Sequence, residues 1–166
     1  EVAGYPLYCG LRSLLWPEDP VGQLWRSCDL VREHRGDSHI AVWTRAMVQP
    51  IEMQLMSELQ LGIPLKTYSM TRGWTIDEMD AALDGMRTKG WVAGDGFTPD
   101  GRVFRERLES ETDAMETPLV DAISADFDQL IGILRPWAAT IVKVGIQGGG
   151  YPGGADAIAG MMRPAR

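Results

Sequence analysis

Apolar residues recur every three or four positions across the first third of the chain, which is the pattern of amphipathic helices. The first of these helices carries one apolar stripe, formed by Val21, Leu24, Trp25, Cys28 and Val31. Gly36 predicts the end of this helix, because glycine readily takes the left-handed conformation that follows a helix C-terminus. Asp37 or Ser38 then predicts the cap of a second helix, which continues to about Met47.

Two further helices are predicted in the middle of the chain. One starts at Pro50 and ends where the sequence LGIPL interrupts the apolar pattern. The other starts at the sequence TIDE, a capping box in which the Thr75 hydroxyl accepts from the Glu78 amide and the Glu78 carboxylate reaches back. It ends at Lys89, because a cation suits the last turn of a helix and the glycine after it suits the next position.

A β-hairpin and long helices complete the predicted pattern. The sequence WVAGDGFT, residues 91–98, has short apolar arms around a Gly-Asp-Gly turn, which predicts a tight hairpin. A threonine–proline pair at 98–99 predicts the cap and first residue of a long helix, and the same pair recurs at 117–118. Ser124 opens a last long helix, in which Pro136 predicts a bend.

This order of elements is that of a mainly α protein with a winged helix-turn-helix, a short β-hairpin wing and long C-terminal helices. With 166 residues and a hydrophobic fraction of 45%, the chain suits one domain with a packed core. We expect an irregular segment over residues 1–19, a winged-helix domain with dimerisation helices over 20–144, and a Gly-rich flexible tail over 145–166. The first residue is Glu and not Met, which suggests a processed or truncated product.

Residues 73–109, GWTIDEMDAALDGMRTKGWVAGDGFTPDGRVFRERLE, resemble the core of MarR-like winged-helix proteins. In that family a capped helix ends in a basic turn, a hairpin wing follows, and a threonine motif opens the dimerisation helix. That last motif corresponds here to Phe97, Thr98, Gly101 and Arg102.

A closer resemblance covers roughly residues 14–140 and is to the C-terminal portion of an actinobacterial family of helix-turn-helix proteins. It is carried by the segments WPEDPVGQLWRSCDLVREHRGDSHIA, RGWTIDEMDAALDGMRTKGWV and FTPDGRVFRERLESETD. In that family a helical segment precedes the matching region. The resemblance implies a winged-helix fold, but a fold does not by itself specify a function.

The charges of this region leave two interpretations of the winged helix open. A DNA-reading helix presents basic or amide side chains to the bases, whereas the outward positions of residues 76–89 are mostly Asp77, Glu78, Asp80 and Asp84. Asp95 occupies the tip of the wing, and the net charge of −7 also disfavours a polyanionic partner. If the chain binds DNA, the candidate contacts are Arg72, Arg87, Lys89, Arg102 and Arg105. If it does not, the winged helix is a scaffold or an interaction surface.

The run REHRGDSH at residues 32–39 gathers cations and both histidines of the chain. If a helix ends at Gly36 and another starts at Ser38, the free amides and the nearby cations would form a pocket for a small carboxylate or phosphate. The ligand-binding candidates are Arg32, His34, Arg35 and His39.

Two alternatives for this run stay open. In one, its arginines pair with Glu33, Asp37 or the acidic residues 77–84, and its histidines bond backbone carbonyls. In the other, the two histidines and a carboxylate from Asp37 or Glu33 form a metal site.

Nothing in the sequence identifies a catalytic site. Ser38 and His39 are adjacent in the sequence, which is no evidence that they form a nucleophile and base. Phosphate-loop and dinucleotide fingerprints are absent, so any cofactor is unknown. Cys9 and Cys28 form no disulfide framework, and Cys28 is expected to be buried in an apolar stripe. No apolar run is long enough to span a membrane, and we expect a reduced, cytoplasmic homodimer.

The sequence therefore favours a non-enzymatic winged-helix regulatory protein that binds DNA as a transcriptional regulator and senses a small anionic ligand. The alternative is a small-ligand or metal-binding module with a degenerate winged helix that does not bind DNA.

Overall fold

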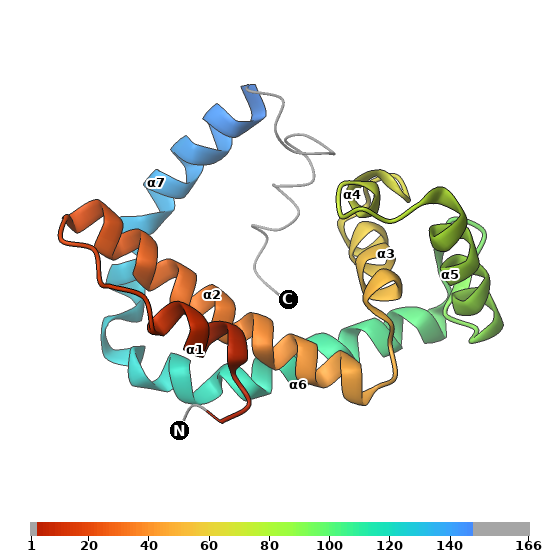
Figure 1. Cartoon of the computed structure of the whole chain (residues 1–166), viewed down its shortest axis with the longest axis horizontal. Helices are drawn as coiled ribbons and strands as arrows, with labels where there is room; N and C mark the ends of the chain where they lie inside the picture. The colour runs from red at the N-terminus through yellow and green to blue at the C-terminus, as the bar shows by residue number, and fades with distance from the viewer. Residues whose placement is uncertain (1–2, 148–166) are drawn as a thin grey trace. The chain divides into compact units, whose positions relative to one another are not determined.

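A computed structural model describes residues 3–147, in which seven α-helices, one 3-10 turn and one β-hairpin form two compact units (Figure 1). The first unit comprises the residues up to Val48 together with Glu106–Asp121. The second comprises Gln49–Arg105 and the segment from Ala122 onward. The structure confirms a mainly α fold with a small hairpin. The predicted flexible tail lies almost wholly outside the described residues.

In the first unit, two N-terminal helices pack on each other, and the second of them bonds to the middle of a third helix. They are α1 (Pro6–Arg12), α2 (Pro20–Arg45) and α6 (Pro99–Ala122). Asp19 starts α2 by accepting a hydrogen bond from the Gly22 amide at 2.8 Å, and Pro20 takes the first helical position. The buried residues of this unit include Ser38, Val42, Leu108, Thr112 and Glu116.

The predicted helix break at Gly36 is wrong, because α2 runs without interruption from Pro20 to Arg45. Neighbouring helices account for this: Asp37 and Ser38 are only 4% and 0% exposed, and both bond to other helices instead of capping a new one. These tertiary contacts outweigh the low helix propensity of one glycine. The predicted burial of Cys28 is also wrong, since its side chain lies on an exposed part of α2.

The N-terminal segment is not wholly irregular, because it contains the short helix α1. Its N-cap residue, Tyr5, supplies no side-chain hydrogen bond. Instead, the two carboxylate oxygens of Asp37 accept from the backbone amides of Leu7 and Tyr8 at 3.1 and 2.9 Å. The helix is therefore capped by a residue of α2, which local sequence patterns do not reveal.

The second unit has the predicted winged-helix order. Its elements are α3 (Pro50–Leu61), α4 (Thr67–Met70), α5 (Ile76–Thr88), β1 (Val92–Ala93), β2 (Gly96–Phe97) and the start of α6. Gly62, with a φ of 67°, ends α3 in the left-handed conformation. The core of the unit is formed by Met53, Leu55, Met56, Met79, Leu83, Met86 and Val92. The same clustered unit also contains η1 (Ser124–Asp126) and α7 (Phe127–Gln147).

The hairpin and the start of α6 meet at the carbonyl group of Trp91. The hairpin pairs Val92 with Phe97 and turns at Gly94, whose φ is 57°. The Thr98 amide donates to the Trp91 oxygen at 3.0 Å, and the Thr98 hydroxyl accepts from the Gly101 amide at 2.9 Å. A Cβ on Gly101 would lie 1.8 Å from that same Trp91 oxygen, so only glycine fits.

The second threonine–proline pair, at residues 117–118, does not start a helix, because α6 continues through Pro118 to Ala122. Glu116, in the turn before this proline, is held by Ser38 and His34 of α2. Such contacts stabilise the continuous helix, although the proline has no backbone N–H and cannot donate a helical hydrogen bond. Pro136 likewise lies inside α7.

Gly36→Ala tests the continuity of α2. A Cβ at this position would have its nearest contacts at 3.5 Å from Glu33 and 3.9 Å from Leu7, which is ordinary packing. We expect the substitution to raise the free energy of unfolding by about 0.5–1 kcal/mol in urea titrations, because alanine favours a helix interior. Gly62→Ala is the control and should destabilise the protein, since Gly62 has a positive φ. Equal losses in both variants would mean that the helix ends at Gly36.

Gly101→Ala tests the junction of the hairpin with α6. The added Cβ would overlap the Trp91 carbonyl group, which is backbone and can move only if the junction moves. We expect the free energy of unfolding to fall by about 1–3 kcal/mol. Gly132→Ala, in α7, meets no atom within 4 Å and serves as the control that should not lose stability. Unchanged stability of Gly101→Ala would contradict the close approach.

Candidate functional site

Helix α5 occupies the position of the recognition helix in a winged helix-turn-helix, and its start is fixed as the sequence predicted. The Thr75 amide donates to Glu78 Oε2 at 2.8 Å, and the Glu78 amide donates to the Thr75 hydroxyl at 3.3 Å. Both bonds of the capping box are present. The hydrogen bonds from the Thr75 backbone and hydroxyl lower the pKa of Glu78, so this carboxylate is charged at neutral pH.

The exposed face of α5 is acidic. Its exposed carboxylates are Asp77, Glu78, Asp80 and Asp84. Lys66 pairs with Asp80, and Arg87 pairs with Asp84 at 2.8 Å, so two basic residues of the region are held against the helix. A phosphate backbone approaching this face would meet these carboxylates, and like charges repel.

The five predicted DNA contacts differ in how available their charges are. Arg105 is only 6% exposed, and Lys89 donates to both oxygens of Glu52, at 2.7 and 2.9 Å. Arg87 is engaged by Asp84, as described above. Arg72 stacks on the Tyr68 ring at 4.7 Å, and Arg102 lies over the Phe97 ring at 5.8 Å. An aromatic ring does not neutralise the charge of a guanidinium group, as a carboxylate does. Of the five residues, Arg72 and Arg102 are therefore the most available to bind an anion.

The arginines of the run at 32–39 are paired with carboxylates. Arg32 lies 2.6 Å from Glu33 and 3.3 Å from Asp29. Arg35 donates to Glu109 at 2.7 Å and to Asp113 at 3.1 Å, both on α6. Burial lowers the pKa of Arg35, but the hydrogen bonds and charges of Glu109 and Asp113 outweigh burial, and the pKa is raised overall. These ion pairs favour the interpretation of this run as structural, although two of the partners lie far away in the sequence.

The two histidines also face α6. His34 Nδ1 lies 2.8 Å from Glu116 Oε2, and the other oxygen of Glu116 accepts from the Ser38 hydroxyl at 2.6 Å. Tyr5 of the N-terminal segment stacks on the His34 ring with a centroid distance of 4.2 Å. His39 Nδ1 lies 3.1 Å from the Thr112 hydroxyl. Because α2 continues through this region, the helix N-terminus that the predicted anion pocket required is not there.

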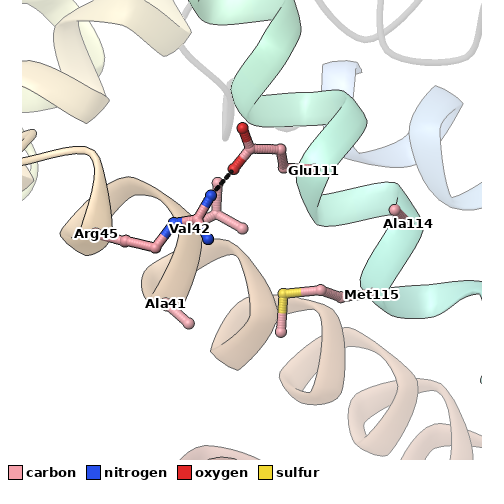
Figure 2. Close-up of a pocket in the computed structure, with 6 residues that line it drawn as sticks. All are labelled: Ala41, Val42, Arg45, Glu111, Ala114 and Met115. Atoms are coloured by element: carbon pink, nitrogen blue, oxygen red, sulfur yellow. Dashed lines mark hydrogen bonds and ion pairs between the residues drawn. The ribbon is translucent and has the colours of Figure 1, made fainter.

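Shallow clefts open on the surface of the described residues, among them the following three. The Ala41 cleft of about 410 Å³ lies between α2 and α6, where Arg45 donates to Glu111 at 3.0 Å. Figure 2 shows this pair together with Ala41, Val42, Ala114 and Met115. The Arg35 cleft of about 310 Å³ is lined by Val31, Arg32, Arg35, Asp113, Leu119 and other residues. The α3–α5 cleft of about 400 Å³ is lined mainly by Ile51, Glu52, Trp74, Glu78, Ala81 and Ala82.

Neither a metal site nor a membrane span emerges from the described part of the chain. Within residues 3–147, no group of three or more His, Cys, Asp or Glu side chains is placed to hold a metal ion. In the same range, no helix combines the length and the apolar character that crossing a bilayer requires.

Acid titration of stability tests the charged state of Glu78. Because its pKa is lowered in the folded protein, the charge stabilises the fold at neutral pH, and this contribution is lost as the pH falls through that lowered value. The melting temperature of Glu78→Gln should therefore be lower than that of the parent protein at pH 7, and the two should converge as the pH falls below the ordinary range of a glutamate. Asp95→Asn, at the hairpin tip, is the matched control. A gap between parent and Glu78→Gln that does not narrow in acid would contradict this account.

The geometry described above agrees with the comparison of the sequence with known families. A profile described as a helix-turn-helix family matches residues 1–147. No functionally curated protein and no solved structure matches the chain. The match spans most of the sequence and includes the complete α3–α4–α5–hairpin order. The chain therefore belongs to this helix-turn-helix family.

Proposed function

We propose that this helix-turn-helix protein is a non-enzymatic transcriptional regulator that binds DNA through its second unit. The observation that carries the proposal is the order α3–α4–α5–β1–β2 in a chain of this family. In a winged helix-turn-helix, the helix at the place of α5 enters the major groove and the hairpin contacts the adjacent backbone. The family profile supports helix-turn-helix character, and the MarR-like relationship remains part of the proposal.

The proposed binding depends on phosphate contacts more than on reading bases. Arg72 precedes α5 and Arg102 follows the hairpin, and both guanidinium groups lie on aromatic rings. Arg87 and Lys89 could add contacts only by leaving Asp84 and Glu52. Because phosphate contacts carry little sequence information, we expect weak discrimination between sequences.

A homodimer is part of the proposal and is supported by α7. The exposed apolar residues of this helix include Phe127, Leu130, Trp137 and Ile141. Together with Leu134 they follow alternating spacings of three and four, which is the spacing of a helix that packs against another helix. We do not extend the proposal to anion sensing at Arg32 and Arg35, because carboxylates already neutralise both.

A second candidate function is favoured by the acidic face of α5. If Asp77 and Glu78 exclude phosphates, the winged helix serves as a surface for other partners, and the chain regulates without binding DNA.

Fluorescence anisotropy of a labelled GC-rich duplex distinguishes the two functions. At a salt concentration about tenfold below physiological, the proposed regulator should bind the duplex and lose affinity steeply as salt rises. Arg102→Ala should reduce the slope of log affinity against log salt by about 1, because one phosphate contact is lost.

Arg135→Ala is the control for this titration. It removes the same charge from an exposed position of α7 and should leave the slope unchanged. An anisotropy that does not change at low salt would reject DNA binding and favour the second candidate. Equal effects of the two variants would show that only the net charge matters.

A further inference from the structure

The α3–α5 cleft combines carboxylates, an indole ring and small apolar side chains in one place. It lies where α3 begins, at Ile51 and Glu52, beside the part of α5 between Glu78 and Gly85. From this combination we infer that the cleft binds an arginine side chain of a basic protein segment, a partner that the proposed DNA binding does not involve.

The apolar part of the cleft suits the stem and plane of an arginine. Ala81 and Ala82 leave room that longer side chains of α5 would fill. The Trp74 indole nitrogen donates to Gln54 Oε1 at 2.8 Å, and this bond fixes the orientation of the ring. A guanidinium group stacks on such a ring while its aliphatic stem covers apolar surface.

The two carboxylates of the cleft differ in their bonded partners. Glu52 is 4% exposed, and its oxygens accept from the Lys89 ammonium group, which also lies 4.5 Å from the Trp91 ring centroid. The chain thus already holds one cation between a carboxylate and an indole at this surface. Glu78, at the other end of the cleft, is exposed, and its bonded partner is the neutral Thr75. A cation supplied by another molecule and bound at Glu78 would repeat the arrangement of Lys89, which lies between a carboxylate and an indole ring.

The charges beside the cleft indicate a segment with several cations and not a single small amine. Asp77, Ala81 and Asp84 follow one another at helical spacing, so both aspartates share a face with one wall of the cleft. Seven residues of helix separate the aspartates by about 10 Å, which one guanidinium group cannot span. A peptide with arginines on successive turns can reach Glu78 and Asp77 together, and a further arginine can share Asp84 with Arg87.

Binding of a short arginine-rich amphipathic peptide to the full chain tests this inference. The peptide is labelled with fluorescein, and its anisotropy is followed at physiological salt. An otherwise identical peptide with citrulline in place of arginine keeps the shape and removes the charge. We expect the arginine peptide to bind at least tenfold more tightly than the citrulline peptide, and the Trp74 indole N–H resonance to shift during the titration.

Two substitutions separate the cleft from general attraction to an acidic protein. Glu78→Gln keeps a residue that can complete a capping box, so α5 should remain intact while the affinity falls several-fold. Ala82→Leu leaves every charge in place and fills the cleft, and should reduce the affinity tenfold or more. Ala81→Leu, at an exposed position of the same wall, replaces it if Ala82→Leu does not fold. Asp95→Asn, outside the cleft, should change the affinity less than twofold.

The remaining outcomes overturn the inference. Unchanged affinity in the variant with a filled cleft would mean that the peptide is attracted only by diffuse charge. Binding of butylguanidinium as tight as that of the peptide would assign the cleft to a small guanidinium compound. These results do not depend on DNA, because no duplex is present, so a failure here and a failure of the proposed DNA binding are distinguishable.

Discussion

The second unit depends on the backbone around Trp91, where three elements share a few hydrogen bonds. The Trp91 amide donates to the Met86 carbonyl group, which ties the end of α5 to the hairpin. The Trp91 oxygen accepts from the Thr98 amide, and the Thr98 hydroxyl donates to the Gly90 oxygen at 2.6 Å. Gly101 allows α6 to start against this carbonyl group. The helix, the wing and the following helix are thereby fixed to one another without a large sheet.

The elements that could be predicted from the sequence are those with local causes. The capping box at Thr75 and the glycine turn at Gly94 involve residues within a few positions of each other, and local rules describe them well. The continuous course of α2 through Gly36 could not be predicted, because residues of α1 and α6 decide it. A glycine followed by an aspartate indicates the end of a helix only where no neighbouring helix binds that aspartate.

The candidate site was predictable in its residue types but not in its pairings. The acidic character of α5 was visible in the sequence, since the helical period alone places Asp77 and Asp84 outward. The partners of Arg35 are 74 and 78 residues away, and Lys89 reaches Glu52 across 37 residues. Such distant pairs decide which cations remain available to an anion. In this chain they leave the winged helix with fewer available cations than its arginine and lysine content suggests.

The capping of α1 by Asp37 has a consequence for how the chain folds. A helix of 7 residues is too short to persist alone, because nucleation costs more than so few backbone bonds return. Its first turn is completed by a carboxylate about thirty positions downstream, on a helix that must already exist. We therefore expect α1 to form late during folding, by docking onto a preformed α2. During synthesis this segment leaves the ribosome before α2 does, and it becomes helical only after α2 has followed.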